Sequence, residues 1–177
     1  MMGLMMGLMR DLIRGSMSGF NPSRAHWLWL SAMVIALDQL SKGLAERLLP
    51  LHEPVALMPL LNLTLMHNEG AAFSLLADAG GWQRWLFAGF AVLVTIVLVS
   101  WLLRLNAREH LTAAALALLI GGAIGNLIDR LRTGRVVDFI DVHYGEWHWP
   151  AFNLADSAIT LGVILLLIET LRAGRDA

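Results

Sequence analysis

Four stretches of this chain approach the length and apolar character of a membrane-spanning helix. The hydrocarbon core of a bilayer is about 30 Å thick and requires roughly 20 helical residues. The stretches run approximately over Trp27–Leu44, Trp85–Leu103, Leu111–Leu127 and Leu154–Leu171. The chain is 57% hydrophobic and 15% charged, which is unusually apolar and sparsely charged for a soluble domain. We therefore predict an all-α membrane protein with four transmembrane helices.

Two segments between these spans, at about residues 46–83 and 128–152, are expected to lie outside the membrane. In the first segment Leu61, Leu63 and Leu65 occupy alternate positions, the period of two that is typical of a β-strand. The second contains RVVDFIDVHYGEWHW, whose β-branched and aromatic residues predict a strand or hairpin. The fold prediction therefore includes a small extracytoplasmic β element.

The orientation of the chain follows from its charges and from the even number of spans. Basic residues flank the two sides almost equally, so their count alone decides little. An even number of spans puts both termini on one side, and the arginines before the first span favour the cytoplasm. We predict a poorly ordered cytosolic tail over residues 1–25, a single four-helix domain over 26–172 and a cytosolic tail over 173–177.

Composition excludes several functional classes. A net charge of -1 without a basic block argues against nucleic acid as a partner. The chain has no cysteine, which removes disulfides, thiolate metal sites and a cysteine nucleophile. Its six histidines have no metal-ligand spacing, and Ser41, Ser74 and Ser157 have no identifiable neighbouring base. We predict no metal and no other cofactor.

Ionisable residues in or beside the predicted spans are candidates for function, since a charge within a bilayer costs about 2.5 to 3.5 kcal/mol. Asp38 and Lys42 are spaced i, i+4 and can pair on one helix face, either to anchor the helix end or to support a site. Asn126 shares a helix face with Asp129 and Arg130, as a satisfied helix end or as part of a site.

Two further features lie near the ends of the third and fourth spans. Gly121, Gly122 and Gly125 permit close packing of helices in a membrane. Asn153 is a good N-cap, and Asp156 would sit in the first turn, where amides and the helix dipole stabilise a carboxylate. Capping alone does not explain why so many polar residues gather at the same membrane depth. They are Asp38, Asn68, Asn126, Asp129, Asp138, Asn153 and Asp156.

Two carboxylates that share one proton can hydrolyse a peptide bond, provided that their pKa values are pushed apart. A helix N-terminus would favour the ionised form of Asp156, and apolar neighbours on a strand would favour the neutral form of Asp138. Spacing alone leaves the partner of Asp156 open among Asp129, Asp138 and Asp141. Strand alternation puts Asp138 and Asp141 on opposite faces, so at most one of them is expected to face inward.

Five ordered motifs resemble those of the lipoprotein signal peptidases, also called signal peptidase II. They are Asp38-Gln-Leu-Ser-Lys42, Asn68-Glu-Gly-Ala-Ala-Phe73, Gly125-Asn-Leu-Ile-Asp-Arg130, Val136-Val-Asp-Phe-Ile140 and Phe152-Asn-Leu-Ala-Asp156. The resemblance covers about Trp27 to Leu171. It departs from the family at Glu69, where threonine is common.

The resemblance implies an aspartyl endopeptidase with Asp138 and Asp156 as its catalytic pair. The implied substrate is a diacylglyceryl-modified prolipoprotein, cut on the amino side of the lipidated cysteine, at the periplasmic face of a bacterial inner membrane. Globomycin-type inhibitors, membrane lipids and a monomeric state are also implied. The supporting residues that the resemblance implies are Asp38, Lys42, Asn68, Gly70, Asn126, Asp129, Arg130, Asn153 and Ala155.

Two other functional classes compete with a peptidase. A small proton-coupled transporter would also use intramembrane carboxylates, but neither inverted repeats nor broken helices are visible in the sequence. A structural or assembly subunit would account for the glycines at 121, 122 and 125 but not for the polar cluster.

Overall fold

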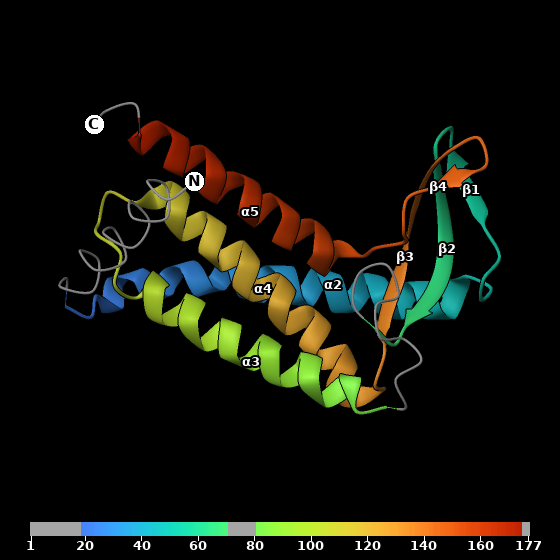
Figure 1. Cartoon of the computed structure of the whole chain (residues 1–177), viewed down its shortest axis with the longest axis horizontal. Coiled ribbons are helices and arrows are strands. Elements are labelled where there is room, and N and C mark those ends of the chain that lie inside the picture. Colours follow the sequence, from blue (N-terminus) through green and yellow to red (C-terminus); the bar gives the residue numbers. More distant parts are fainter. Residues whose placement is uncertain (1–18, 71–80, 175–177) are drawn as a thin grey trace.

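The computed structural model describes residues 19–70 and 81–174, and they form a helical bundle with a small sheet at one end (Figure 1). A short 3-10 helix, η1 (Pro22–Trp27), precedes the long helix α2 (Leu28–Leu48). The other helices are α3 (Gln83–Leu102), α4 (His110–Arg132) and α5 (Leu154–Ala173). The predicted tail over residues 1–25 lies mostly outside the described residues, and its end forms part of η1.

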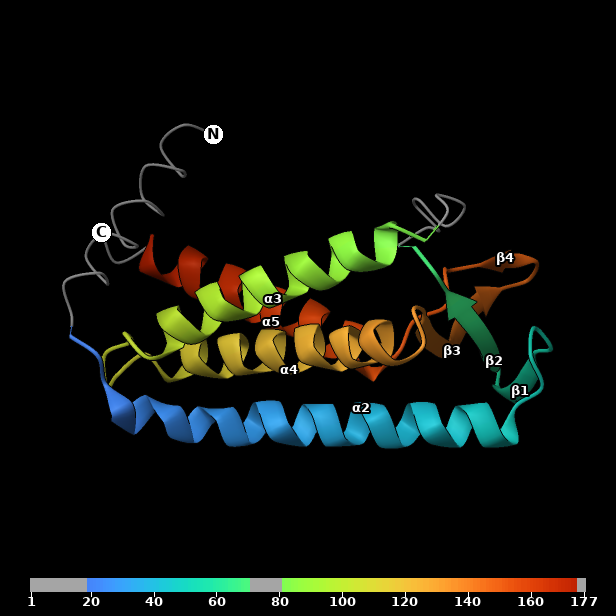
Figure 2. The same cartoon turned by 90° about the horizontal axis from the view of Figure 1, so that it is seen from below.

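Helix α4 occupies the centre of the bundle and packs against α2, α3 and α5 (Figure 2). Its glycines allow this close approach. A Cβ at Gly121 would lie 2.7 Å from Cβ of Val34 on α2, and one at Gly122 would lie 2.4 Å from the carbonyl oxygen of Ala155 on α5. The predicted packing by small residues is thereby confirmed.

Three of the described helices, α3, α4 and α5, are long and apolar enough to cross a membrane. Helix α2 has 21 residues, but the polar residues Asp38, Gln39 and Lys42 interrupt its apolar sequence. Most of α4 is buried inside the bundle, whereas few residues of α3 and α5 are buried and many of their large apolar side chains are exposed. A surface of this kind is stable only against lipid or another apolar partner.

The sheet contains four antiparallel strands in the order β1 (Val55–Met58), β2 (Leu61–Asn68), β3 (Val136–Tyr144) and β4 (Trp147–His148). The alternation at residues 61–65 and the RVVDFIDVHYGEWHW segment thus form strands, as predicted. The sheet lies at the end of the bundle where α2 ends and α5 begins (Figure 1). A buried cluster of Ala45, Leu65, Val137 and Phe139 joins α2 to the sheet.

The pairing of β2 with β3 fixes the residues that face the helices. Met66 lies opposite Asp138 and Asn68 lies opposite Val136, while a β-bulge interrupts the register between Leu63 and Met66. Bulges bend a strand and redirect its side chains, and they are common beside functional sites.

Candidate active site

Asp138 is the third residue of β3 and is almost completely buried, with 3% of its surface exposed. One of its oxygens accepts a hydrogen bond from Nδ2 of Asn153 at 2.7 Å, and the other accepts one from Nδ2 of Asn68 at 3.1 Å. Burial and then the neighbouring carboxylate of Asp156 raise the pKa of Asp138 to about 7, although the two amides oppose the rise. Near neutral pH this carboxyl group can therefore hold a proton.

Asp156 lies in the first turn of α5, where the predicted N-cap is present. Asn153 accepts a hydrogen bond from the backbone N–H of Asp156 at 2.9 Å, and Asp156 accepts one from the backbone N–H of Asn153 at 3.3 Å. The other oxygen of Asp156 accepts a hydrogen bond from Nδ2 of Asn126 at 2.7 Å. Nδ2 of Asn153 also lies 3.2 Å from Oδ1 of Asn126, so two amides connect Asp156 to Asp138.

Behind these amides lies the buried ammonium group of Lys42. Its Nζ is 2.8 Å from Oδ2 of Asp38, 2.8 Å from Oδ2 of Asp129 and 2.9 Å from Oδ1 of Asn126. The pair of Asp38 and Lys42 is thus present, and it contacts residues of α4 besides closing on its own helix. Because Asn126 accepts from Lys42, its amide nitrogen points toward Asp156, and the lysine fixes the orientation of that donor.

Asp38 also links α2 to α5 across α4. Its Oδ1 accepts a hydrogen bond from the backbone N–H of Ala155 at 2.9 Å, and its side chain is fully buried. Glycine at position 125 makes room for this contact, since a Cβ there would lie 2.7 Å from Oδ2 of Asp38. Three helices are therefore held in register directly behind the two aspartates.

The remaining supporting residues hold the ends of β2 and β3. Oδ2 of Asp129 accepts a hydrogen bond from the backbone N–H of Val137 at 3.2 Å, next to Asp138. The Arg130 guanidinium donates to the carbonyl oxygen of Gly70 at 3.3 Å, and the N–H of Gly70 donates to Oδ1 of Asn68 at 3.0 Å. All the predicted supporting residues therefore surround the two aspartates or their partners, except that residues 71–73 of the Asn68 motif lie outside the described residues.

Gln39 belongs to the same network although it was not among the predicted site residues. Its Nε2 donates to Oδ1 of Asp129 at 2.9 Å and lies within hydrogen-bond distance of the carbonyl oxygen of Gly125 and of Oδ2 of Asp38. The spacing i, i+3 between Gln39 and Lys42 could have identified it, because it puts both residues on one helix face.

Asp141 is also buried, although its side chain lies on the opposite face of β3 from that of Asp138. Asp138 faces the helices, whereas Asp141 is covered by Thr64 of β2 and His148 of β4. Thr64 Oγ1 donates to Oδ2 of Asp141 at 2.8 Å, and Nδ1 of His148 lies 2.7 Å from its Oδ1. Burial raises the pKa of Asp141, but these hydrogen bonds outweigh burial and lower it. Strand alternation alone could not predict that other residues of the sheet would cover the face of β3 on which Asp141 lies.

Asp138 and Asp156 line one cavity of about 1020 Å³. Part of its wall is polar, with Asn68, Asn126 and Arg130, and part is apolar. Ile159, Leu161 and Ile164 of α5 belong to the apolar part, and the latter two are about half exposed. The cavity therefore combines a carboxyl group that can donate a proton, a second carboxylate and a surface suited to an apolar chain.

Comparison with known proteins matches this arrangement to one family. The family model described as Signal peptidase (SPase) II matches residues 30–172. The chain belongs to the signal peptidase II family. This membership makes it an aspartyl peptidase, and it decides against the transporter and the assembly subunit.

Relatives of this peptidase include a lipoprotein signal peptidase of Acinetobacter baumannii, which is 56% identical over 85% of this chain and 86% of its own length. A lipoprotein signal peptidase of Pseudomonas aeruginosa is 51% identical over 86% of this chain and 92% of its own. A bacterial membrane enzyme solved by the in meso method at 2.3 Å resolution superposes with a TM-score of 0.77 at 32% identity. That match covers 86% of this chain and 91% of the solved chain, so the two proteins share one fold.

Proposed function

We propose that this peptidase removes signal peptides from diacylglyceryl-modified prolipoproteins, with Asp138 and Asp156 as the catalytic pair, and that it cuts on the amino side of the lipidated cysteine. The observation that carries the proposal is one cavity with two aspartates, one of which has a pKa near 7, beside an apolar wall. The names of the relatives support the lipoprotein substrate.

In this mechanism an ionised Asp156 removes a proton from water while a neutral Asp138 donates its proton to the carbonyl oxygen of the scissile bond. The oxygen of the water bonds to the carbonyl carbon and gives a tetrahedral intermediate. The intermediate then breaks its C–N bond as Asp156 gives its proton to the leaving amine and Asp138 recovers one from the intermediate. Each aspartate ends in its starting state, so the pair needs no other acid or base.

The surrounding amides and Lys42 support this division of roles. Asn126 donates to Asp156 and thereby stabilises its negative charge. Asn68 and Asn153 hold the carboxyl group of Asp138 in place beside it. The network is connected back to α2 through Lys42, which keeps the two carboxyl groups in a fixed relative position.

We also propose that α2, α3, α4 and α5 all cross the bacterial inner membrane, with both termini in the cytoplasm and the sheet at the periplasmic face. The pairing of Asp38 with Lys42 supports the fourth span, because it neutralises the charges that make α2 less apolar. The start of α2 and the end of α5 lie at the same end of the bundle, away from the sheet (Figure 1). Exposed Trp82, Trp85 and Trp147 suit the membrane interface.

A direct test is a gel-shift cleavage assay with the purified, full-length enzyme and a diacylglyceryl prolipoprotein. We expect release of the signal peptide, no cleavage of the same protein without the lipid, and inhibition by a globomycin-type cyclic peptide. A monomeric enzyme in lipid-containing micelles should suffice. Failure to cut the lipidated substrate under conditions where a characterised relative cuts it would refute the proposed function.

The topology has its own test, a reporter fusion at Ala177. We expect a C-terminal alkaline phosphatase fusion to be inactive, because the phosphatase is active only in the periplasm. An active fusion would place the C-terminus outside and would overturn the proposed position of the aspartates.

A further inference from the structure

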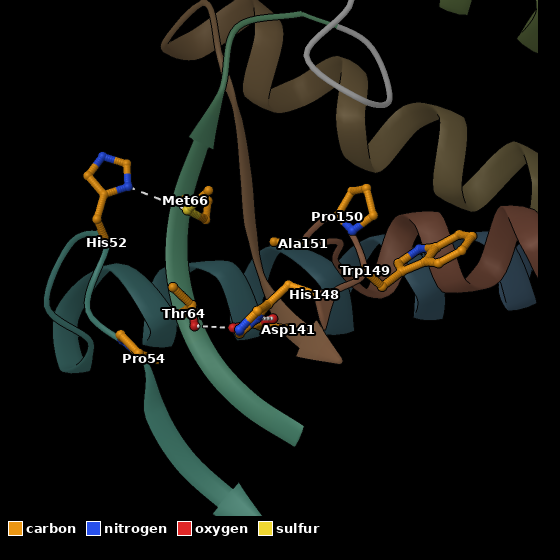
Figure 3. A pocket seen from close by; sticks show the side chains of 9 residues that line it. All are labelled: His52, Pro54, Thr64, Met66, Asp141, His148, Trp149, Pro150 and Ala151. Carbon is orange, nitrogen blue, oxygen red and sulfur yellow. Dashed lines mark hydrogen bonds and ion pairs between the residues drawn. The ribbon is translucent and has the colours of Figure 1, made fainter. Parts of the chain in front are cut away.

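A second cavity of about 360 Å³ lies beside the sheet, and Figure 3 shows the residues that line it. Met66, Trp149, Pro150 and Ala151 line both cavities, so the two share one wall. Met66 follows the bulge in β2, which turns the strand at the place where the cavities meet.

The second cavity contains the polar cluster of Thr64, Asp141 and His148. Asp141 is 6% exposed and its carboxylate accepts hydrogen bonds from the other two residues. Among residues 19–70 and 81–174, no lysine or arginine forms a salt bridge with Asp141. The cluster therefore presents a carboxylate, a hydroxyl group and an imidazole to the cavity.

The position of this cluster suits one part of the substrate. Asp141 lies three positions beyond Asp138 on β3, about 10 Å along the strand, a distance that three residues of an extended peptide also span. The two side chains point to opposite faces of the strand, so a peptide would pass from one cavity to the other over the wall that the cavities share. The apolar wall on α5 extends in the other direction, where a signal peptide would lie in the membrane. The chain that follows the scissile bond must leave the membrane, and the second cavity lies on the side of the sheet.

We propose that the second cavity is a subsite for the first residues after the scissile bond, and that Asp141 and His148 select polar or cationic side chains there over carboxylates. The inference rests on the proposed function. An arriving ammonium or guanidinium group would be attracted by the carboxylate of Asp141, whereas a carboxylate would be repelled by it.

Three synthetic diacylglyceryl peptides test this subsite. They share one signal sequence and differ only in the second and third residues after the cut, which are lysines, glutamines or glutamates. We expect the wild-type enzyme to have a kcat/KM about fivefold higher for the lysine peptide than for the glutamate peptide, the size of one partly exposed ion pair. In Asp141→Asn this ratio should fall to about one, since the charge is removed. Glu146→Gln is the matched control, because it neutralises an exposed carboxylate on the same hairpin that lines neither cavity, and its ratio should equal that of the wild type.

Each result has a defined meaning. If the wild-type enzyme cuts the glutamine peptide but does not distinguish lysine from glutamate, the subsite is refuted while the proposed function stands. If it cuts none of the three, the proposed function fails and the subsite with it. If Asp141→Asn slows all three peptides equally, the cluster only braces the hairpin and the subsite is refuted. Should Asp141→Asn fail to fold, His148→Arg carries the test, because a fixed cation beside Asp141 must bring the ratio to one or below.

Discussion

Strand β3 carries two buried aspartates, Asp138 and Asp141, whose pKa values shift in opposite directions. The pKa of Asp138 rises to about 7, because the group is buried and faces the carboxylate of Asp156. The pKa of Asp141 is lowered, because hydrogen bonds from His148 and Thr64 outweigh its burial. Both side chains are less than a tenth exposed, so exposure does not separate them.

The difference teaches that the partners on each face of the strand decide what a buried carboxyl group can do. Asp138 meets a second acid across a cavity and can hold a proton near neutral pH, as a general acid must. Asp141 meets a hydroxyl group and an imidazole, which stabilise its charged form. An acid that remains charged is suited to binding rather than to proton donation.

The largest expected effect is on the rate of cleavage, which should distinguish Asp138 from Asp141. Asp138→Asn and Asp156→Asn should each lower cleavage by roughly 1000-fold or more, and the double variant should be no worse, because residues of one catalytic unit are strongly non-additive. Asp141→Asn should have a far milder effect on a glutamine-containing substrate. The rates are measured by gel shift on purified variants of equal abundance.

A different outcome would reassign the pair. If Asp138→Asn cut at nearly the wild-type rate while Asp129→Asn were inactive, the catalytic acids would be Asp129 and Asp156. Neither of the two strand aspartates, Asp138 and Asp141, would then be a catalytic residue.

An intermediate effect is expected at Asp129, which contacts Lys42 and the backbone of Val137 but does not line the cavity. Asp129→Asn should lower cleavage by about 10- to 100-fold, because a displaced support moves the reacting groups without removing them. The loss should appear mainly in kcat under single-turnover conditions. A loss as deep as that of Asp138→Asn would place Asp129 in the chemical step.

The pH dependence of protein stability also distinguishes Asp138 from Asp141, and the expected effect is smaller than that on activity. The folded-state pKa of Asp138 lies above its ordinary value of 3.8, so its ionisation destabilises the fold increasingly as the pH rises from about 4 to 7. Asp138→Asn should therefore raise the free energy of unfolding at pH 8, by on the order of 1 kcal/mol or more, and the gain should vanish near pH 4.

Asp141→Asn should act with the opposite sign. Its folded-state pKa is lowered, so the ionised group stabilises the fold above about pH 4 and the contribution is lost on further acidification. At pH 8 the substitution should lower the melting temperature in micelles where Asp138→Asn raises it. If both substitutions changed the melting temperature in the same direction, the opposite pKa shifts of Asp138 and Asp141 would be contradicted.

The smallest expected effect is that of metal removal. We expect EDTA to leave cleavage unchanged, because the proposed proton transfers involve carboxyl groups alone. Loss of activity in EDTA that is restored by a divalent ion would break the interpretation of Asp138 as the acid.

Much of this site could be predicted from local spacing. The pair of Asp38 and Lys42, the cap of Asn153 with Asp156 and the close packing at Gly121 each depend on residues within four positions or on a residue's size. Such features are fixed by helix geometry, which is the same in every protein. The choice of Asp138 over Asp129 and Asp141 was not fixed in this way and rested on family resemblance.

What the sequence could not predict depends on how distant elements meet. His148 contacts Asp141 because of the register of the β3–β4 hairpin, and Thr64 contacts it because β2 lies beside β3. The bulge that brings Met66 between the two cavities leaves no signature in composition or periodicity. For Gln39 the spacing to Lys42 indicates only the helix face, because its partners Asp129 and Gly125 lie on another helix.

The i, i+4 contact between Asp38 and Lys42 also bears on how the chain enters its membrane. Both residues belong to α2, the first of the long helices, so their ion pair forms as soon as that helix forms. If α2 crosses the membrane, as proposed above, it can therefore enter lipid with these two charges already paired, before α4 and α5 are present to contact them. When those helices arrive, Lys42 gains Asp129 and Asn126 while Asp38 gains the amide of Ala155. The same two side chains thus first neutralise each other within α2 and later bind the helices that pack against it.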